Sequence, residues 1–493
     1  MISANEEAAA IYTNDGLPYA TGDLFKNEPL ADTLEAIAKG VIEEFYTGEL
    51  AQKMVDGLQA NGSLMAMEDL ATYTVAEREP IRTEYYGYEV VTVPPPSNGG
   101  DWLLEMLNIM EEKDISQYDP STLEYQYIFN EACRIGLVDS YTYIGDPAFY
   151  DLPVEEMISD EFAAERAALI DMDNMQAMES VPLSDLPVTK LEPTAEESQH
   201  TTHIAVIDQY GNIVSTTNTL GNGWGCKFMA PGLGFFYNSH IGNLDHENPD
   251  SPDYVMPGKR VRSTISPSLV LQDGNPIMAV GSPGSLAIPP AVATIINNVL
   301  LYGMNVQQAI NEPRAMAINR SGMDSPARVS IEQPRFDPDL VAQMEGIGYE
   351  MKDVGEYNMA VGGIAAIYLD RDNGIFYDNF RGVWGALDGN LVYMELSFDG
   401  EVLTTPDGLP VNAIWRRSVT NDVLEFWDDS QDLINAVRAR KVALIGAFSG
   451  HIVHDKQLFE VLFAPETQAF LTEEEIAFVE ETVPMTAFLN DDQ

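Results

Sequence analysis

The most constraining feature of the chain is a pair of alternating segments that begins directly after an irregular stretch. Residues 184–200 contain two prolines and show no apolar periodicity, which is typical of a connector. The segments Thr201–Asp208 and Asn212–Leu220 then alternate apolar and polar residues and are rich in β-branched side chains. A three-residue loop ending in Gly211 separates them. This pattern predicts a β-hairpin that follows a polar connector.

The loop length also predicts which residues face each other across the hairpin. If Asp208 pairs with Asn212, then Thr201 at the start of the first strand lies opposite Thr219 near the end of the second. A change of one residue in the loop would move every pair, so the register is predicted to within about one position.

The rest of the chain alternates predicted helices and strands, which indicates layered α+β packing. Residues 1–183 are mainly helical, and residues 390–493 form a separate acidic tail with a helix near Asn421–Arg440 and a strand at Val442–Phe448. A loop is expected at Pro94–Gly100, because prolines supply no donors and glycines permit unusual φ. Further helices are predicted at Asp32–Leu58, Met67–Leu70, Trp102–Lys113, Ser121–Val138, Glu161–Met172, Ala291–Leu301, Val306–Ile310 and Asp339–Gly346. Further strands are predicted at Glu89–Val93, Ser266–Gln272, Pro276–Val280, Gly363–Leu369 and Gly374–Asp378.

The charge balance excludes two classes of partner. With 78 acidic and 26 basic residues, the formal net charge is -52. Nucleic acids and anionic membranes need a basic surface, so neither is expected as a partner. No run of 18 apolar residues is present, so no membrane span is predicted. The acidic surface favours solubility in a salty medium, with a basic partner as the alternative.

Cysteine and histidine spacing gives no metal site. Cys133 and Cys226 cannot form a disulfide framework, and they are interpreted as a packed helical residue and a loop residue. His451 and His454 are three residues apart, but no third ligand stands near them. No metal site is therefore expected, and none of these residues implies an organic cofactor. The N-terminus shows no secretory signal, which gives a cytoplasmic location as the default.

A threonine at the start of a strand suits one mechanism. A hydroxyl is a poor nucleophile unless a base takes its proton. If the bond between His200 and Thr201 is cut, the new α-amino group of Thr201 can act as that base near neutral pH. The Thr201 hydroxyl can make the cut itself by attacking the carbonyl of His200, and Thr219 across the hairpin could orient it. Ordinary β-propensity is the alternative explanation for the threonine pair at 201–202.

Several motifs, in order, resemble the γ-glutamyltransferase family. They are Thr201-Thr202-His203, Asp208 to Asn212 and Ser215 to Leu220, together with Pro94 to Gly100, Gly145-Asp146-Pro147, Pro257 to Arg260, Ser263 to Pro267, Gly281 to Gly284 and Asn311 to Arg314. The resemblance covers residues from about 10 to about 388. It implies a four-layer αββα core of the N-terminal-nucleophile hydrolases, with residues 1–200 similar to the large subunit and 201–389 to the small one. The tail at 390–493 is an α/β extension outside the family.

The same resemblance implies roles for individual residues. Thr201 would be the nucleophile and, with His200, the processing site, and Thr219 would be its hydroxyl partner. Backbone N–H groups of Gly284 and Ser285 would form the oxyanion hole. Hydroxyl and amide donors of Ser263 and Thr264 would bind a substrate carboxylate, although strand-edge polarity also explains these two residues.

The chain departs from the family at the substrate site. Gly221 stands where the family usually has asparagine, and His240 and Asn243 stand where it has the groups that bind the substrate ammonium. A neutral Asn243 loses a charge-assisted contact, typically worth about 1.5–3 kcal/mol. Met1 also begins inside the family pattern, so the family's first large-subunit portion has no counterpart in this chain.

The resemblance implies an amide hydrolase or transferase that works through an acyl-Thr201 ester. Its partners would be a small γ-glutamyl or related amide, an acceptor amino acid, dipeptide or water, and the two cleaved fragments, which stay associated. Family members are often periplasmic or extracellular. The alternative is a non-catalytic or truncated homologue with a structural or binding role.

Overall fold

In the computed structural model, the chain forms two compact units, Met1–Trp384 and Gly385–Gln493. The structure describes residues 4–14, 16–20, 23–40, 43–186, 200–207, 212–249, 251–318, 327–370 and 375–380, and short strand segments beyond residue 396. The predicted helix near Asn421–Arg440, the three-residue hairpin loop and most of the connector lie outside the described residues.

A six-stranded antiparallel sheet is the largest element of the first unit, and its strand order is β13-β12-β8-β7-β4-β3. Its strands are β3 (Ile81–Tyr85), β4 (Tyr88–Thr92), β7 (Ser268–Gln272), β8 (Asn275–Gly281), β12 (Ala365–Asp370) and β13 (Ile375–Phe380). Strands from before and after the connector therefore lie side by side, with β4 paired to β7.

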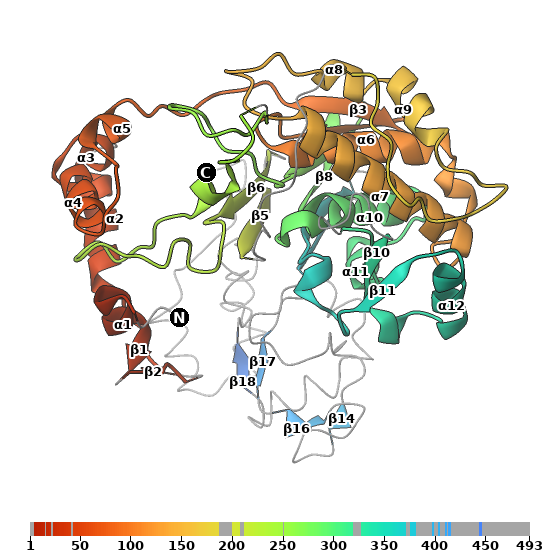
Figure 1. Cartoon of the computed structure of the whole chain (residues 1–493). Coiled ribbons are helices and arrows are strands. Elements are labelled where there is room, and N and C mark those ends of the chain that lie inside the picture. Colours follow the sequence, from red (N-terminus) through yellow and green to blue (C-terminus); the bar gives the residue numbers. More distant parts are fainter. Residues whose placement is uncertain are drawn as a thin grey trace, which may run out of the picture. The chain divides into compact units, whose positions relative to one another are not determined.

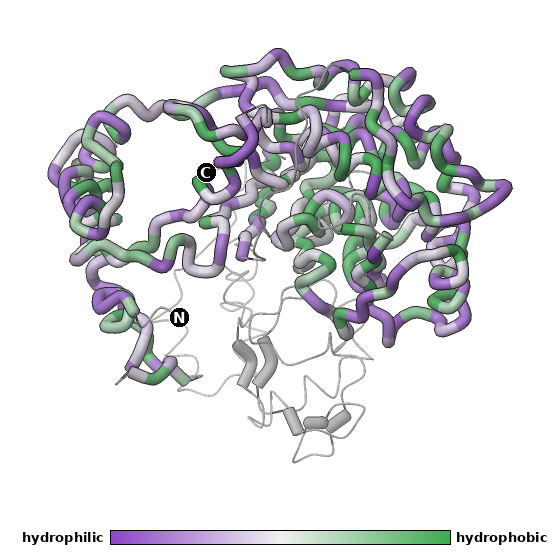
Figure 2. The backbone as a smooth tube through the Cα atoms, viewed as in Figure 1, coloured by the Kyte–Doolittle hydropathy of each residue, from purple (hydrophilic) through white to green (hydrophobic). Residues whose placement is uncertain are grey.

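Helices cover one face of this sheet (Figure 1). Met278 and Val280 of β8 belong to the large apolar cluster that also holds Ala291 and Ile295 of α10. Helix α10 is apolar along most of its length (Figure 2). The main helices of this layer are α6 (Asn98–Glu112), α7 (Leu123–Tyr143), α9 (Asp160–Ala167), α10 (Ile288–Leu300) and α11 (Val306–Asn311).

The predicted hairpin packs on the opposite face of the sheet. Strands β5 (Thr201–Ile207) and β6 (Ile213–Thr219) are antiparallel, and Thr201 faces Thr219 as predicted. Gly281 of β8 contacts the ring of His203, because successive residues of a strand point to opposite faces and Gly281 therefore faces the hairpin. Helix, sheet and hairpin thus form three layers in the described part of the chain.

The remaining elements lie around this core. Side chains of α4 and the segment around residues 228–237 share a small apolar cluster. A second sheet has the order β11-β10-β9. The elements are α1 (Glu6–Tyr12), α2 (Glu28–Gly40), α3 (Glu43–Tyr46), α4 (Glu49–Gln59), α5 (Met67–Ala71), α8 (Val154–Met157), α12 (Pro338–Gly346), β1 (Thr13–Asn14), β2 (Leu17–Pro18), β9 (Ala315–Met316), β10 (Arg328–Ile331) and β11 (Glu350–Asp353). The second unit holds β14 (Ser397–Phe398), β15 (Leu403–Thr404), β16 (Pro410–Val411), β17 (Ala413–Trp415) and β18 (Ala443–Ile445).

Several sequence predictions were wrong at a boundary: α7 ends at Tyr143 rather than Val138, α9 ends at Ala167 rather than Met172, and α10 begins at Ile288 rather than Ala291. The loop expected over Pro94–Gly100 ends early, because α6 begins at Asn98 and includes both glycines. A side chain on Gly99 would collide with the carbonyl of Thr264, and one on Gly100 would collide with the carbonyl of Val93. The glycines therefore let the first turn of the helix lie directly against the backbone of two neighbouring segments.

Candidate active site

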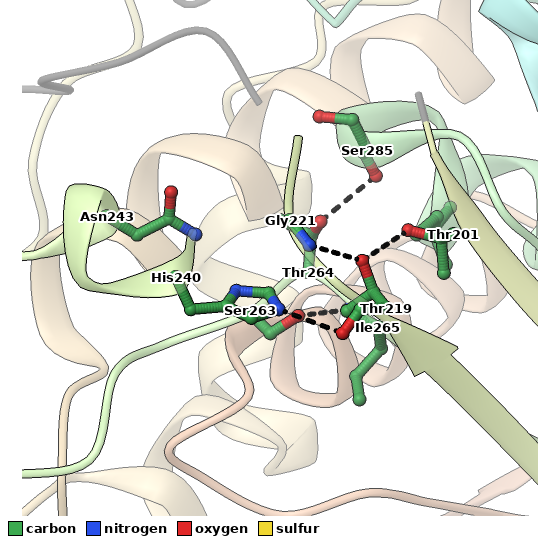
Figure 3. Close-up of a pocket in the computed structure, with 10 residues that line it drawn as sticks. Thr201, Thr219, Gly221, His240, Asn243, Ser263, Thr264, Ile265 and Ser285 are labelled. Carbon is green, nitrogen blue, oxygen red and sulfur yellow. Dashed lines mark hydrogen bonds between the residues drawn. The ribbon is translucent and has the colours of Figure 1, made fainter. Parts of the chain in front are cut away.

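The two facing threonines of the hairpin are in contact. The Thr201 hydroxyl donates a hydrogen bond to the Thr219 hydroxyl oxygen over 3.1 Å, and the backbone N–H of Gly221 donates to the same oxygen over 3.0 Å (Figure 3). The Thr201 proton is thus directed toward Thr219. This leaves lone pairs of the Thr201 oxygen available in other directions for attack on a carbonyl carbon.

A short 3₁₀ helix at His240–Asn243 lies beside the threonine pair. The His240 Nε2 is 3.3 Å from the carbonyl oxygen of Thr219 (Figure 3). A carbonyl only accepts, so Nε2 carries the proton, and in the neutral ring Nδ1 is an acceptor. Nδ1 is buried and has no hydrogen-bond partner among the described residues.

The segment at residues 263–265 is held in place by the start of α6. The Ser97 hydroxyl lies 2.7 Å from the carbonyl oxygens of both Ser263 and Ile265, and the backbone N–H of Asn98 donates to the carbonyl of Ser263 over 2.9 Å. The Thr264 hydroxyl donates to the carbonyl of Ser285 over 3.0 Å. Thr264 is therefore an internal link, whereas the Ser263 side chain lies at the pocket surface.

The expected oxyanion segment has a backbone that glycine and few other residues adopt. Gly284 has φ 138° and Ser285 has φ 58°, and such positive φ values are strained for a residue with a side chain. A 3₁₀ turn and then α10 follow directly. The amino end of a helix carries partial positive charge, so this end of α10 favours a developing oxyanion.

The segment at Gly284 is also supported from behind. The backbone N–H of Gly363 donates to the carbonyl of Pro283 over 3.1 Å. The buried Arg314 donates to the carbonyls of Val361 and Gly362, each over 2.8 Å. The arginine of the asparagine-glutamate-proline-arginine motif therefore holds the backbone at residues 361–362, directly before Gly363, which bonds to the oxyanion segment.

These elements meet at one pocket (Figure 3). It brings together every predicted site residue except His200 and Gly284, and it adds two isoleucines that sequence reasoning missed. The lining residues are Thr201, Thr219, Gly221, His240, Asn243, Ser263, Thr264, Ile265, Ser285 and Ile288. None of the ten has a carboxylate, lysine or arginine side chain. Ile288 was missed because α10 starts three residues before its predicted first residue, Ala291.

Two other singled-out residues have structural roles. Asp146 is buried and accepts from the backbone N–H groups of Arg260 and Ala148 over 2.7 and 3.1 Å, which ties two of the motifs together. His203 is also buried, and its Nδ1 is 2.8 Å from the Thr217 hydroxyl. Burial lowers the pKa of His203 to about 4, so its ring is neutral near pH 7.

The described residues form neither a metal-binding cluster nor a membrane-spanning helix. They contain no group of three or more histidine, cysteine, aspartate or glutamate side chains arranged to hold a metal ion. In the same part of the chain, no helix combines the length and the apolar character needed to span a bilayer.

Comparison with known proteins identifies the class of the chain. The profile of the gamma-glutamyltranspeptidase family matches residues 1–387. The fold is similar to the crystal structure of cephalosporin acylase from Bacillus halodurans, with a TM-score of 0.67 and 27% identity over 78% of this chain and 67% of that one. The chain belongs to the gamma-glutamyltranspeptidase family, whose members are N-terminal-nucleophile hydrolases.

Two kinds of curated relative are similar to this chain. The glutathione hydrolase proenzyme of Bacillus subtilis subsp. natto is 30% identical over 379 residues, which are 75% of this chain and 62% of that protein. That of Escherichia coli K12 is 33% identical over 70% of this chain and 59% of its own length. The acylase ACY 1 proenzyme of Pseudomonas sp. SE83 is 34% identical over 62% of this chain and 53% of its own length. The chain thus spans about 60% of the length of these relatives.

Proposed function

We propose that the chain is an amide hydrolase or transferase that is activated by its own cleavage between His200 and Thr201. The observation that carries this proposal is the hydrogen bond from the Thr201 hydroxyl to Thr219 at the first residue of β5, inside a pocket that ends at α10. In this proposal residues 1–200 and 201–389 are the two associated subunits of a four-layer αββα core, and residues 390–493 are an added tail.

Cleavage proceeds by an acyl shift from nitrogen to oxygen. The Thr201 oxygen attacks the carbonyl carbon of His200, the peptide C–N bond breaks, and an ester joins the two residues. Water hydrolyses the ester, which leaves a carboxylate on His200 and an amine on Thr201. The amine then serves as the base that the hydroxyl otherwise lacks.

Turnover repeats this chemistry on a substrate amide. The Thr201 α-amine accepts the hydroxyl proton while the oxygen attacks the substrate carbonyl. The N–H groups of Gly284 and Ser285 stabilise the oxyanion, and removal of one such donor typically costs about 10²–10³ in rate. The leaving amine takes the proton, and water or an acceptor amine such as an amino acid or dipeptide resolves the acyl-Thr201 ester.

The pocket favours an acyl donor that bears a carboxylate and does not depend on an ionic contact to an ammonium. The Ser263 hydroxyl and the amide donors at Thr264 suit the carboxylate. The Asn243 amide can form hydrogen bonds, but no lining residue offers a carboxylate. A γ-glutamyl amide can bind there, and a related acyl donor without the amine loses little binding affinity. Glutathione hydrolases and an acylase among the relatives agree with this range.

Two measurements test the proposal. A denaturing gel should show two fragments, residues 1–200 and 201–493, and Thr201→Ala should leave the chain intact. Release of aniline from a γ-glutamyl anilide, with and without a dipeptide acceptor, separates hydrolase from transferase activity. An intact wild-type chain after long incubation would instead favour the non-catalytic homologue with a structural or binding role.

A further inference from the structure

We propose that His200 is a positioning residue for the self-cleavage, and that its imidazole is seated on Gly223 for this purpose. The inference rests on the proposed cleavage between His200 and Thr201, and it adds a residue on the other side of the scissile bond. The segment at residues 219–225, which we call the 219–225 loop, holds both residues that flank the bond.

The first contact of the 219–225 loop is on the Thr201 side. The Thr219 oxygen accepts from the Thr201 hydroxyl, and Gly221 donates to that same oxygen. The attacking oxygen is therefore fixed relative to the start of the loop.

The second contact is on the His200 side. A side-chain carbon on Gly223 would lie 2.6 Å from Nε2 and 2.7 Å from Cδ2 of His200. The imidazole thus lies directly over the glycine. Gly223 is buried, whereas its φ is outside the positive region, so the backbone itself does not require glycine at this position. The atoms that a side chain on Gly223 would meet are those of the exposed His200 ring.

The other two glycines of the loop permit its backbone conformation. Gly221 has φ 83°, and Gly225 has φ 56° and lies directly against the carbonyl of Tyr237. A hydrogen bond from the Gly225 N–H to the Asn222 carbonyl over 2.7 Å closes the turn. A loop that contacts both residues restricts how the Thr201 oxygen can approach the His200 carbonyl, and such restriction accelerates intramolecular attack.

The experiment is a double-mutant cycle on the rate of cleavage. The full chain is produced by cell-free synthesis, and the appearance of the two fragments is followed on a denaturing gel for the wild type, Gly223→Ala, His200→Ala and the double variant. We expect each single substitution to slow cleavage about tenfold, because each disrupts the contact between the His200 ring and Gly223. We expect the double variant to be about tenfold slower as well, because the two changes disrupt one contact.

Two controls separate positioning from folding. Gly346→Ala adds a methyl group where no atom lies within 4 Å, so it should cleave at the wild-type rate. Thermal unfolding of each variant in a Thr201→Ala background should change by no more than a few degrees.

Several results would overturn the inference while leaving the proposed function intact. They are cleavage of His200→Ala at the wild-type rate, multiplication of the two effects to about a hundredfold, and slow cleavage only in variants that also unfold early. A wild-type chain that never cleaves would overturn both proposals.

Discussion

At the residue scale, the Thr201–Thr219 pair makes the most direct prediction. Thr219→Val keeps the shape of the side chain and removes the oxygen that accepts from Thr201. We expect cleavage and turnover per cleaved site to fall about ten- to a hundredfold, the range for a hydrogen bond of about 1.5–3 kcal/mol to a reacting group. Thr219→Ser should recover most of the rate, and Thr216→Val, on the exposed face of the same strand, should change neither. Wild-type rates in Thr219→Val would show that the hydroxyl pair has no part in the chemistry.

The uncharged side chain of Asn243 in the pocket gives a second residue-scale prediction. Asn243→Asp places a carboxylate where the ten lining residues have none. The ratio of kcat/KM for a γ-glutamyl anilide to that for a glutaryl anilide should rise about ten- to a hundredfold, because only the first substrate carries an ammonium that can pair with it. Asn275→Asp adds the same charge at the exposed turn between β7 and β8 and serves as the control. An unchanged ratio would place the substrate amine away from residue 243.

At the element scale, helix α6 carries acidic groups that the reaction does not use. Asp101 is buried, and neither carboxylate oxygen has a hydrogen-bond partner among the described residues. Burial raises the pKa of Asp101 to about 8. Burial and the neighbouring Asp139 also raise the pKa of Glu105, and Arg166 pairs with Asp139. The Arg166 guanidinium thus acts on Asp139 and Glu105, whereas Asp101 is neutral near pH 7 because it holds its proton.

These groups make the stability depend on pH in a stated direction. Between pH of about 4 and about 8 the folded chain holds the Asp101 proton and the unfolded chain does not, so the free energy of unfolding falls as pH rises. One such group contributes a slope of about 1.4 kcal/mol per pH unit. Denaturant unfolding of a Thr201→Ala chain at pH 5 to 8 should show this slope, and Asp101→Asn should reduce it. Equal slopes with and without Asp101, or the same reduction from the exposed Glu345→Gln, would contradict the assignment.

The elements that could be predicted from the sequence are those with local signals. The register of the hairpin follows from loop length and alternation, and Thr201 faces Thr219 as the arithmetic requires. The start of α6 could not be found in the same way, because Asn98-Gly99-Gly100 indicates a loop unless the neighbouring carbonyls that exclude side chains are known. The sheet β11-β10-β9 was not predicted, since strands of two to four residues carry almost no periodicity.

At the scale of the whole molecule, the pocket depends on pairings between distant parts of the sequence. Strand β4 pairs with β7 across the connector, and the Ser97 hydroxyl reaches the segment at residue 263. No local pattern predicts such contacts, so a residue such as Ile288 lines the pocket without a sequence signal of its own. The resemblance to a family indicated the polar site residues, because they lie in short motifs of consecutive residues that can be recognised in the sequence. It did not indicate the apolar residues, whose role is set by packing alone.

The net charge of -52 gives a prediction for the whole chain. Repulsion among like charges destabilises the compact state. Salt weakens this repulsion, because the Debye length falls from about 10 Å at 0.1 M to about 3 Å at 1 M. The melting temperature of the Thr201→Ala chain should therefore rise with NaCl, most steeply below about 1 M. Sucrose at matched osmolality does not screen charge, so it should give a smaller increase over the same range. If NaCl gives no increase, or no more than sucrose does, then repulsion between the acidic groups does not limit the stability of this fold.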